Sequence, residues 1–477
     1  MVQAIKSIAA AAMPLVVAAG IAHGATFSPG SLVVYRTGNG SGAVTSAPAP
    51  VFLDEYSPTG ALLQSIALPT AASGVNKPLI AQGDAALEGL LHRSADGKSL
   101  LLTGYNHQLG TPIPAEAGGN GTLAQTNSSV VNRTIGRVDA AGLINTATTI
   151  SDSGQGSPRS AVSDDGVNLW VSHGSISGGT DGGVRYTTVG ATGASTMVSN
   201  ATTDPRTVNI FNGQLYLSTV GGGSNPPVQA IGSDLPHVGG QTTTGLTGVL
   251  GSTSRNVIDF FLADLDANVH GPDTLYVSGD NEAAITKYSL VESTWISNGT
   301  VGTTADDYRG IAGVVSGSSV TLYATRANGA SADSLVSLVD STGYNSTAGA
   351  FSALAPTTIA TAGANTLFKG VAFAPVNPTA IPGDFTGNGV VDGDDLDKWK
   401  VDFGTDGSDA NGDTITDGAD FLVWQRHYGE GAAPSFAPSV PEPTSILSLF
   451  SATVTMWTAH NRKRARRYTS KPLFELG

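Results

Sequence analysis

The sequence predicts an all-β body followed by a small all-α module, and three observations lead to this fold class. The 477 residues include 61 Gly and 24 Pro, a density of turn residues that excludes coiled coils and long helical bundles. Short apolar strand patterns recur through residues 25–380, whereas an acidic loop–helix pattern occurs twice in residues 381–430. Only 13% of the residues are charged and 40% are hydrophobic, which excludes a disordered acidic protein.

The composition also excludes several kinds of site and partner. The chain has no cysteine, so it has no disulfide, no cysteine nucleophile and no cysteine-based zinc site. The net charge of −14 argues against nucleic acid as a partner, because phosphate binding needs clustered cations.

Residues 1–24 have the pattern of a secretory signal peptide. Lys6 supplies a positive charge, an uncharged apolar run follows from Ile8 to Ile21, and small residues lie at Ala22 and Gly24. The alternative is a buried first helix, which the glycines and proline that follow disfavour. We therefore expect an exported chain that begins near Ala25.

The body contains a divergent repeat. A glycine turn precedes a strand pattern of leucine, then an aromatic or aliphatic residue, then an apolar residue. The first leucines of these patterns are Leu100, Leu169, Leu215, Leu275 and Leu322. Short strands with glycine turns at a period of about 40–60 residues are typical of β-propellers.

Counting these units predicts six blades for residues 25–380. Five are internal, and the sixth combines Phe368–Phe373 with strands near Leu32–Tyr35 and Val51–Leu53, which removes exposed sheet edges. Seven blades remain an alternative because the interval between Leu100 and Leu169 is wide. A pair of β-sandwiches or a β-helix would give the same density of turns.

Basic residues precede the predicted innermost strands of successive units. In a propeller they would converge near the central channel, and such a ring of cations would favour an anionic ligand such as an acidic sugar. The alternative is that each arginine pairs with a nearby acid, such as Asp204 or Asp307. The ring comprises Arg159, Arg206, Arg255, Arg309 and Lys369.

Catalytic patterns are scarce in the body. It has no dinucleotide or phosphate-binding loop, no G-x-S-x-G and no H-E-x-x-H. Its histidines are isolated, and we expect His173 to follow a strand and face a loop surface. The sequence therefore predicts no catalytic residue.

Residues 381–430 contain a duplicated twelve-residue loop rich in oxygen donors. Hard oxygen ligands at alternating positions suit Ca²⁺ better than Mg²⁺ or zinc, so we expect two calcium sites. A solvated linker is the alternative. The expected ligands are Asp384, Thr386, Asn388, Val390, Asp392 and Asp395 in the first loop, and Asp409, Asn411, Asp413, Ile415, Asp417 and Asp420 in the second.

The two copies also agree beyond their ligands. Trp399 corresponds to Trp424 and Gly404 to Gly429, so each loop is expected to lead into a helix that starts at the last ligand and stops at glycine. The region 381–430 resembles a type I dockerin module. The resemblance implies folding that depends on Ca²⁺ and docking onto a cohesin-like partner.

The carboxyl end has a second composite signal after a short linker, 431–439. Pro441, Glu442 and Pro443 precede an uncharged stretch from Ile446 to Ala459, which a basic cluster follows. Residues 440–477 resemble a PEP-CTERM sorting signal, which implies recognition by an exosortase-type enzyme at the membrane. The alternative is a simple membrane tail.

These features predict a non-enzymatic binding or scaffolding protein that is exported to the cell surface or the extracellular space. Its expected partners are the processing enzyme, a docking module and an extracellular polysaccharide. The alternative function is a polysaccharide-active enzyme, a lyase or glycoside hydrolase, displayed by the same modules.

Overall fold

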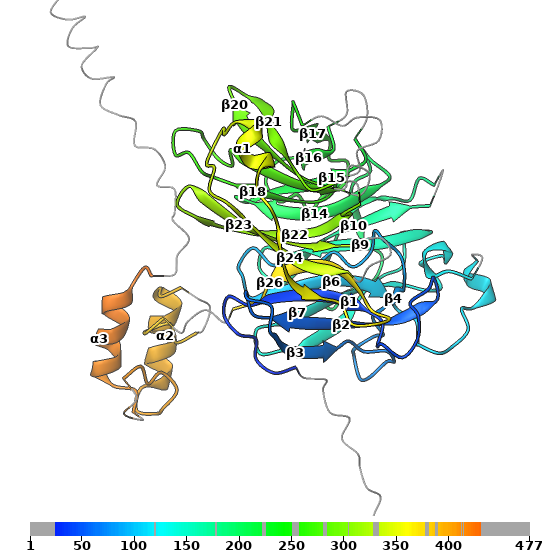
Figure 1. Cartoon of the computed structure of the whole chain (residues 1–477). Coiled ribbons are helices and arrows are strands. Elements are labelled where there is room, and N and C mark those ends of the chain that lie inside the picture. Colours follow the sequence, from blue (N-terminus) through cyan, green and yellow to red (C-terminus); the bar gives the residue numbers. More distant parts are fainter. Residues whose placement is uncertain are drawn as a thin grey trace, which may run out of the picture. The chain divides into compact units, whose positions relative to one another are not determined.

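The computed structural model describes residues 24–430 apart from 119–120, 177–178, 222–225, 250–256, 280–283, 304, 328–332, 377–380, 387–389, 412 and 414. The chain divides into two compact units, Met1–Asn377 and Pro378–Gly477. The first is built of strands and the second contains two helices (Figure 1). The signal-like segment before residue 24, Arg255, Asn388 and the tail after residue 430 lie outside the described residues.

Four sheets of four antiparallel strands make up the middle of the first unit, which confirms an all-β body. The predicted leucine patterns form the second strand of each sheet, because the glycine turn before each leucine ends the first hairpin. The sheets are β9 (Gly156–Val162), β10 (Asn168–Ser175), β11 (Gly183–Thr188) and β13 (Thr196–Ser199); β14 (Pro205–Phe211), β15 (Gln214–Thr219), β16 (Val228–Ile231) and β17 (Thr243–Gly245); β18 (Val257–Ala263), β19 (Thr274–Gly279), β20 (Ile285–Val291) and β21 (Thr294–Val301); and β22 (Tyr308–Ser316), β23 (Ser319–Arg326), β24 (Ser334–Asp340) and β25 (Thr357–Thr361).

A fifth sheet of ten strands combines two such groups. One group is β5 (His92–Arg93), β6 (Ser99–Tyr105), β7 (Arg133–Asp139) and β8 (Ile144–Ile150), with β12 (Thr192–Gly193) on its edge; the other is β26 (Leu367–Phe373), β1 (Leu32–Thr37), β2 (Pro48–Tyr56) and β3 (Leu62–Ala67). Strand β4 (Ile80–Gln82) joins them by pairing with both β2 and β6. The join is possible because β2 extends beyond its partners at Pro48–Pro50.

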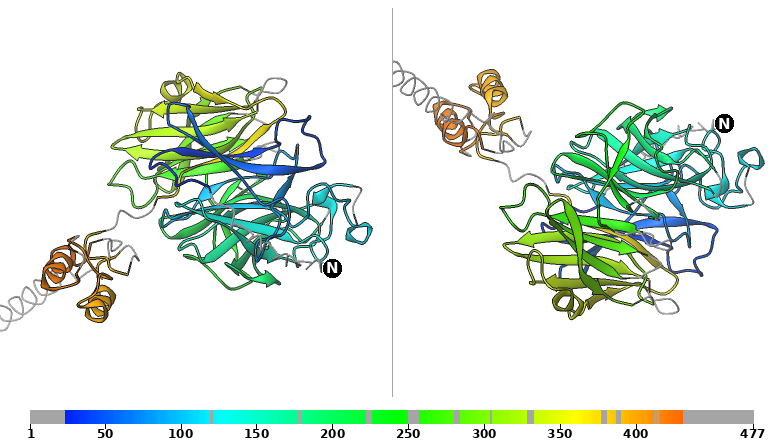
Figure 2. Two further views of the ribbon diagram at one scale, coloured as in Figure 1. Left: turned by 90° about the horizontal axis from the view of Figure 1, so that it is seen from below. Right: turned by 90° about the horizontal axis from the view of Figure 1, so that it is seen from above.

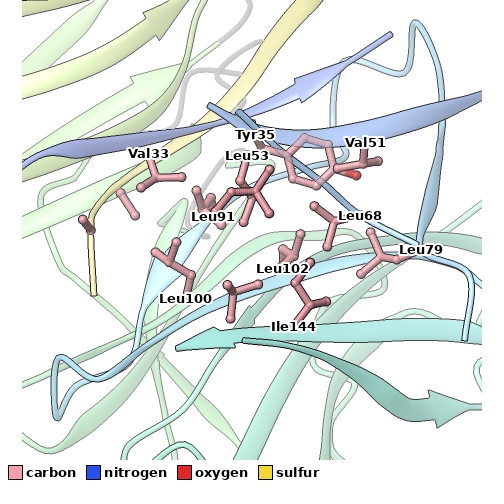
Figure 3. Packing of buried hydrophobic residues seen from close by; sticks show 14 of the residues in the cluster. Val33, Tyr35, Val51, Leu53, Leu68, Leu79, Leu91, Leu100, Leu102 and Ile144 are labelled. Atoms are coloured by element: carbon pink, nitrogen blue, oxygen red, sulfur yellow. The ribbon is translucent and has the colours of Figure 1, made fainter. Parts of the chain in front are cut away.

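The two ends of the body pair in one group of strands, as the sequence predicts. Leu32 lies opposite Phe373 and Val34 opposite Val371, so β1 and β26 are antiparallel neighbours (Figure 2). Val33 and Leu53 pack against Leu91 and Leu100 in a core between the two groups of the large sheet (Figure 3). Burial of this apolar surface stabilises the contact between the first and last strands.

The first strands of successive groups contact one another in a closed series: β5, β9, β14, β18, β22, β26 and again β5. A hydroxyl on the second strand of one group donates to a first-strand carbonyl of the next, and this contact recurs five times. The donor–acceptor pairs are Thr103–Pro158, Ser172–Arg206, Ser218–Ile258, Ser278–Arg309 and Thr325–Lys369. We call these five contacts the hydroxyl latches. Between β1 and β6, the Tyr35 hydroxyl instead donates to a second-strand carbonyl, that of Thr103, at 3.3 Å.

The wide interval between Leu100 and Leu169 comes from an insertion between β6 and β7. It carries two 3-10 turns, η1 (Ala115–Ala117) and η2 (Leu123–Gln125). A short helix, α1 (Ala348–Ser352), follows β24 and contacts β21 of the preceding sheet.

The second unit contains helices α2 (Gly393–Asp402) and α3 (Gly418–His427). The prediction that each helix starts at the last loop ligand is wrong by two residues. Asp392 and Asp417 occupy the N-cap positions, and Asp395 and Asp420 complete capping boxes, so each helix begins one residue after its cap. Within the described part of the chain, no helix is both long and apolar enough to cross a membrane.

Candidate functional site

Four of the predicted ring residues occupy equivalent places in the first strands of their sheets. Arg159, Arg206, Arg309 and Lys369 each lie where the pairing with the second strand shifts register. The sequence pattern predicted these residues just before the innermost strands. That prediction is wrong, because each residue lies at a β-bulge and the bulge belongs to its strand. At the same register shift of β18 the residue is Ile258, whereas Arg255 lies outside the described residues.

Two of these arginines share one carboxylate. Asp204 lies 2.7 Å from a guanidinium nitrogen of Arg159 and 3.0 Å from one of Arg206. Burial, followed by the positive charge of Arg206, lowers the pKa of Arg159 to about 10 against the opposing effect of Asp204. The Nε atom of Arg159 is buried and has no hydrogen-bond partner among the described residues.

The other two cations are held in a similar way. Arg309 pairs with Asp307 at 2.9 Å, so both acids that the sequence analysis offered as partners are engaged. Lys369 is 2% exposed and donates from Nζ to the Ala85 carbonyl at 2.6 Å. Burial lowers the pKa of Lys369 to about 8, with a smaller contribution from the charge of Arg309.

Glu88 is the residue that sequence reasoning missed. Its carboxylate is buried and accepts hydrogen bonds from the Tyr105 hydroxyl at 2.6 Å and the Ser157 hydroxyl at 2.8 Å. Burial raises the pKa of Glu88, while these hydrogen bonds and the charge of Lys369 oppose the shift. Glu88 therefore places a carboxyl group among the cations of the ring.

A glycine after the charged residue is the signal that would have found Glu88. Glu88-Gly89 matches Arg309-Gly310 and Lys369-Gly370 in sequence. These glycines are needed because the first strands approach closely: a Cβ on Gly370 would lie 2.3 Å from the Leu91 nitrogen.

Two further basic side chains lie near this group. Arg133 is 1% exposed, donates to the carbonyls of Thr126 and Val131, and lies with its guanidinium 5.0 Å from the centre of the Tyr105 ring. His173 lies within β10 and is 1% exposed, so the expectation of a loop-surface histidine is wrong. Burial, followed by the charge of Arg133, lowers the pKa of His173 well below its usual value, which keeps the ring neutral.

We call the group Glu88, Arg159, Arg206, Arg309 and Lys369 the charged ring. Its cations outnumber its acid, and its members come from five of the six contacting first strands or the segment before them. Such a cluster can hold an anion through its guanidinium and ammonium donors. Deep burial restricts its use as acid–base machinery, because proton transfer requires contact with a substrate.

The loops of the second unit carry the predicted oxygen donors. Asp395 is fully buried and accepts from the Thr386 nitrogen and the Asp392 nitrogen, each at 2.8 Å. Asp420 accepts equivalently from the nitrogens of Asn411, at 3.2 Å, and Asp417, at 2.8 Å. Each terminal carboxylate therefore folds its loop back onto the start of its helix.

Among the described residues of both units, no three acidic or histidine side chains gather closely enough to hold a metal ion. The donors are nevertheless hard oxygens of the kind that Ca²⁺ takes, from carboxylates, Thr386, Asn411 and the carbonyls of Val390 and Ile415. Asp409 accepts the Asp413 nitrogen at 3.1 Å, which curves the second loop around its first donor. The donor chemistry of the loops therefore fits calcium.

No protein-family profile and no curated protein matches the chain. Among solved structures, it is similar to the Penicillium chrysogenum α-L-arabinanase in complex with arabinobiose, with 11% identity, a TM-score of 0.35, and coverage of 69% of this chain and 97% of that one. It is also similar to the α-L-arabinofuranosidase of Fusarium graminearum with arabinobiose, with 12% identity, a TM-score of 0.34, and coverage of 68% and 92%. A third structure, the Dos1 propeller, has 10% identity, a TM-score of 0.33, and coverage of 57% and 62%.

Proposed function

We propose that this chain is an exported, non-enzymatic binding protein with a six-bladed β-propeller body, a calcium-binding dockerin-like module and a sorting tail. The six blades are supported by the closed series of contacts from β5 through β26 and by the hydroxyl latches between neighbouring groups. The insertion after β6 accounts for the wide interval that left a seventh blade open.

The single observation that carries a binding role is the pairing within the charged ring. Asp204 is engaged by two arginines and Asp307 by a third, so these acids neutralise cations instead of facing a substrate. The Nε of Arg159, which has no hydrogen-bond partner among the described residues, favours an anionic group of an extracellular polysaccharide. Asp204 keeps part of its side chain in solvent, so this side of the ring is the accessible one.

The second unit supports the proposal that the chain is docked onto a partner and displayed outside the cell. Two loops with oxygen donors and two capped helices are what a paired calcium loop–helix module requires. In this proposal Ca²⁺ replaces the amide donors around the loop carboxylates, and the module docks onto a cohesin-like or other partner. The sorting signal at Pro441–Pro443 would direct the chain to an exosortase-type enzyme and the cell surface.

A second candidate is a polysaccharide-active enzyme, and one contact favours it. The Glu88 carboxyl and the Tyr105 hydroxyl lie 2.6 Å apart, and burial raises the pKa of both groups. A carboxyl group with a raised pKa can act as a general acid. Release of reducing ends from polysaccharides, lost in Glu88→Gln, would favour this candidate over the binding role.

The test combines a glycan array with calcium calorimetry on residues 25–430. We expect binding to acidic glycans that weakens when Arg159 and Arg206 are both replaced by glutamine, without release of sugar products. Arg326→Gln is the control, because this ion-paired arginine lies in the second strand of its sheet. Unchanged glycan binding in the double variant would refute the charged ring as the site. The absence of a heat signal on titration with Ca²⁺ would refute calcium binding by the second unit.

A further inference from the structure

A separate hollow lies further along the same first strands, beyond the charged ring. It has a volume of about 210 Å³ and is lined by residues of β5, β14, β18, β22 and β26. Its polar lining is His92, Arg93, Ser94 and Asn209, and its aromatic lining includes Phe211, Phe261 and Phe373. The part of the chain that the structure describes contributes no acidic side chain to its lining.

Among the described residues that line the hollow, Arg93 alone has a permanent charge. Its guanidinium carbon lies 5.8 Å from the centre of the Phe373 ring, and one nitrogen donates to the Ala374 carbonyl at 3.4 Å. None of the described acids lies within ion-pairing distance of it. By contrast, Arg159, Arg206 and Arg309 all pair with aspartates. The remaining N–H groups of Arg93 are therefore available to a ligand.

The side chains of His92 and Asn209 are oriented by a chain of hydrogen bonds. Burial lowers the pKa of His92 to about 4, so its ring is neutral. The Asn209 amide nitrogen lies 3.4 Å from His92 Nδ1, which assigns the ring proton to Nε2, and Nε2 donates to Thr207 Oγ1 at 2.6 Å. The Asn209 oxygen accepts the Ile210 nitrogen at 2.9 Å, which leaves its amide nitrogen toward His92 and the hollow. The hollow thus combines a guanidinium and an amide donor.

The aromatic side chains Phe211, Phe261 and Phe373 are half-buried and line the hollow. Phe211 packs edge-to-face against Phe261 with ring centres 5.9 Å apart, and Phe373 packs in the same way against Tyr323 at 5.7 Å. A sugar ring has apolar C–H faces that bury well against such rings, whereas a bare carboxylate would leave them in water.

We propose that this hollow binds one carboxylate-bearing sugar ring, such as a uronic acid residue at the end of a polysaccharide. The guanidinium of Arg93 takes the carboxylate in two parallel hydrogen bonds, and the Asn209 amide donates to a ring hydroxyl. Phe211 and Phe373 cover the apolar face of the sugar. The small volume restricts the site to a single ring, and the absence of lining acids avoids repulsion of the anion.

The test is titration of the full chain with glucuronate, glucose and acetate, followed by calorimetry and ligand-observed NMR. We expect saturable binding of glucuronate, with much weaker binding of glucose and acetate. Arg93→Gln should raise the Kd for glucuronate by about tenfold or more, which corresponds to about 1.4 kcal/mol. Equal binding of acetate and glucuronate, or an unchanged Kd in Arg93→Gln, would overturn the proposal.

A matched control keeps the outcome separate from folding. Arg326→Gln removes a paired arginine outside the hollow and should bind glucuronate like the parent. Loss of glucuronate binding in this control would assign the binding to another site, while failure of the charged ring to bind glycans would leave this proposal standing. Equal melting temperatures of the variants exclude a folding defect.

Discussion

Lys287 and Asp340 form an ion pair of 2.7 Å in which both side chains are completely inaccessible to solvent. Lys287 lies on β20, and Asp340 ends β24 in the next sheet, so the pair joins neighbouring sheets. Its charges are fully satisfied: the Tyr276 hydroxyl donates to Asp340 at 2.6 Å, and Lys287 donates to the Gly343 carbonyl at 2.6 Å. The rings of Tyr276 and Phe351 flank the ammonium group.

Replacing Lys287 alone should therefore destabilise the body strongly. Lys287→Met leaves the buried Asp340 carboxylate without its cation, which costs about 3–5 kcal/mol in the free energy of unfolding. Urea denaturation followed by tryptophan fluorescence measures the change. Arg326→Met is the control, because its pair with Asp306 is partly exposed and its loss should cost less than the loss of the fully buried pair. A double variant with Asp340→Leu should recover stability relative to Lys287→Met, and failure to do so would contradict this explanation.

The hydroxyl latches predict a second set of stability changes. Ser172 Oγ donates to the Arg206 carbonyl at 2.8 Å and accepts the Ser160 nitrogen at 3.1 Å, all in buried surroundings. Ser172→Ala should lower the free energy of unfolding by about 1–3 kcal/mol, because it leaves buried backbone groups unsatisfied. Ser41→Ala, at an exposed loop position, serves as the control and should change stability by less than about 0.5 kcal/mol. Equal effects at the two positions would refute a structural role for the latches.

His92 and Asp259 are both hydrogen-bonded to Thr207, and their opposite pKa shifts predict an unusual pH dependence of stability. Burial raises the pKa of Asp259 from 3.8 to about 7, so its contribution is present below pH 3.8 and is lost as pH rises through 7. Burial lowers the pKa of His92 from 6.5 to about 4, so its contribution is present above pH 6.5 and is lost as pH falls through 4. Between about pH 4 and 6.5, Asp259 lowers the free energy of unfolding as pH rises while His92 raises it, so the two changes largely cancel.

Asp259→Asn should remove the contribution of Asp259 and leave the pH dependence of stability that His92 causes. We expect the free energy of unfolding of this variant, measured in urea from pH 4 to 7.5, to rise with pH where the parent stays nearly flat. The substitution also removes one acceptor for the Ile311 nitrogen, so its overall stability is lower at every pH. An identical pH profile in parent and variant would show that Asp259 does not titrate in this range.

Calcium binding in the second unit is tested by its buried terminal carboxylate. Asp420→Asn keeps the shape of the side chain but removes a charge, so we expect at least a tenfold loss of Ca²⁺ affinity in calorimetry, about 1.4 kcal/mol. Asp397→Asn is the matched control, because Asp397 is 75% exposed and pairs with Lys400 outside the loops. Equal Ca²⁺ affinities of these two variants would exclude the second loop as a site.

The sequence predicted the features that local chemistry determines. The leucine patterns at Leu169, Leu215 and Leu275 became second strands because alternating apolar residues after a glycine turn favour a hairpin. The pairing of β1 with β26 followed from counting strands, since an incomplete last group needs partners. The match between Trp399 and Trp424 is reflected in their reciprocal contacts: each indole nitrogen donates at 2.9 Å to the N-cap carbonyl of the other helix, Asp417 and Asp392.

The features that escaped prediction depend on distant contacts. Strand β4 has only three residues and forms because two other strands offer it edges, which no local pattern encodes. Glu88 was missed because its environment is made by Tyr105 and Ser157, which lie in other strands. The buried state of His173 likewise depends on packing between sheets and not on its neighbours in sequence.

The pairing of β1 with β26 has a consequence for how the body is made. Strands near the start of the chain have no complete set of neighbours until the last strand has emerged from the ribosome, so closure is the final step of folding. A chain that ends before Leu367 would not form a smaller closed body, because β1 would present an unpaired edge to other molecules. Premature termination or proteolysis near β26 is therefore expected to produce aggregation. An intact β26 is thus required to keep β1 from pairing with other molecules.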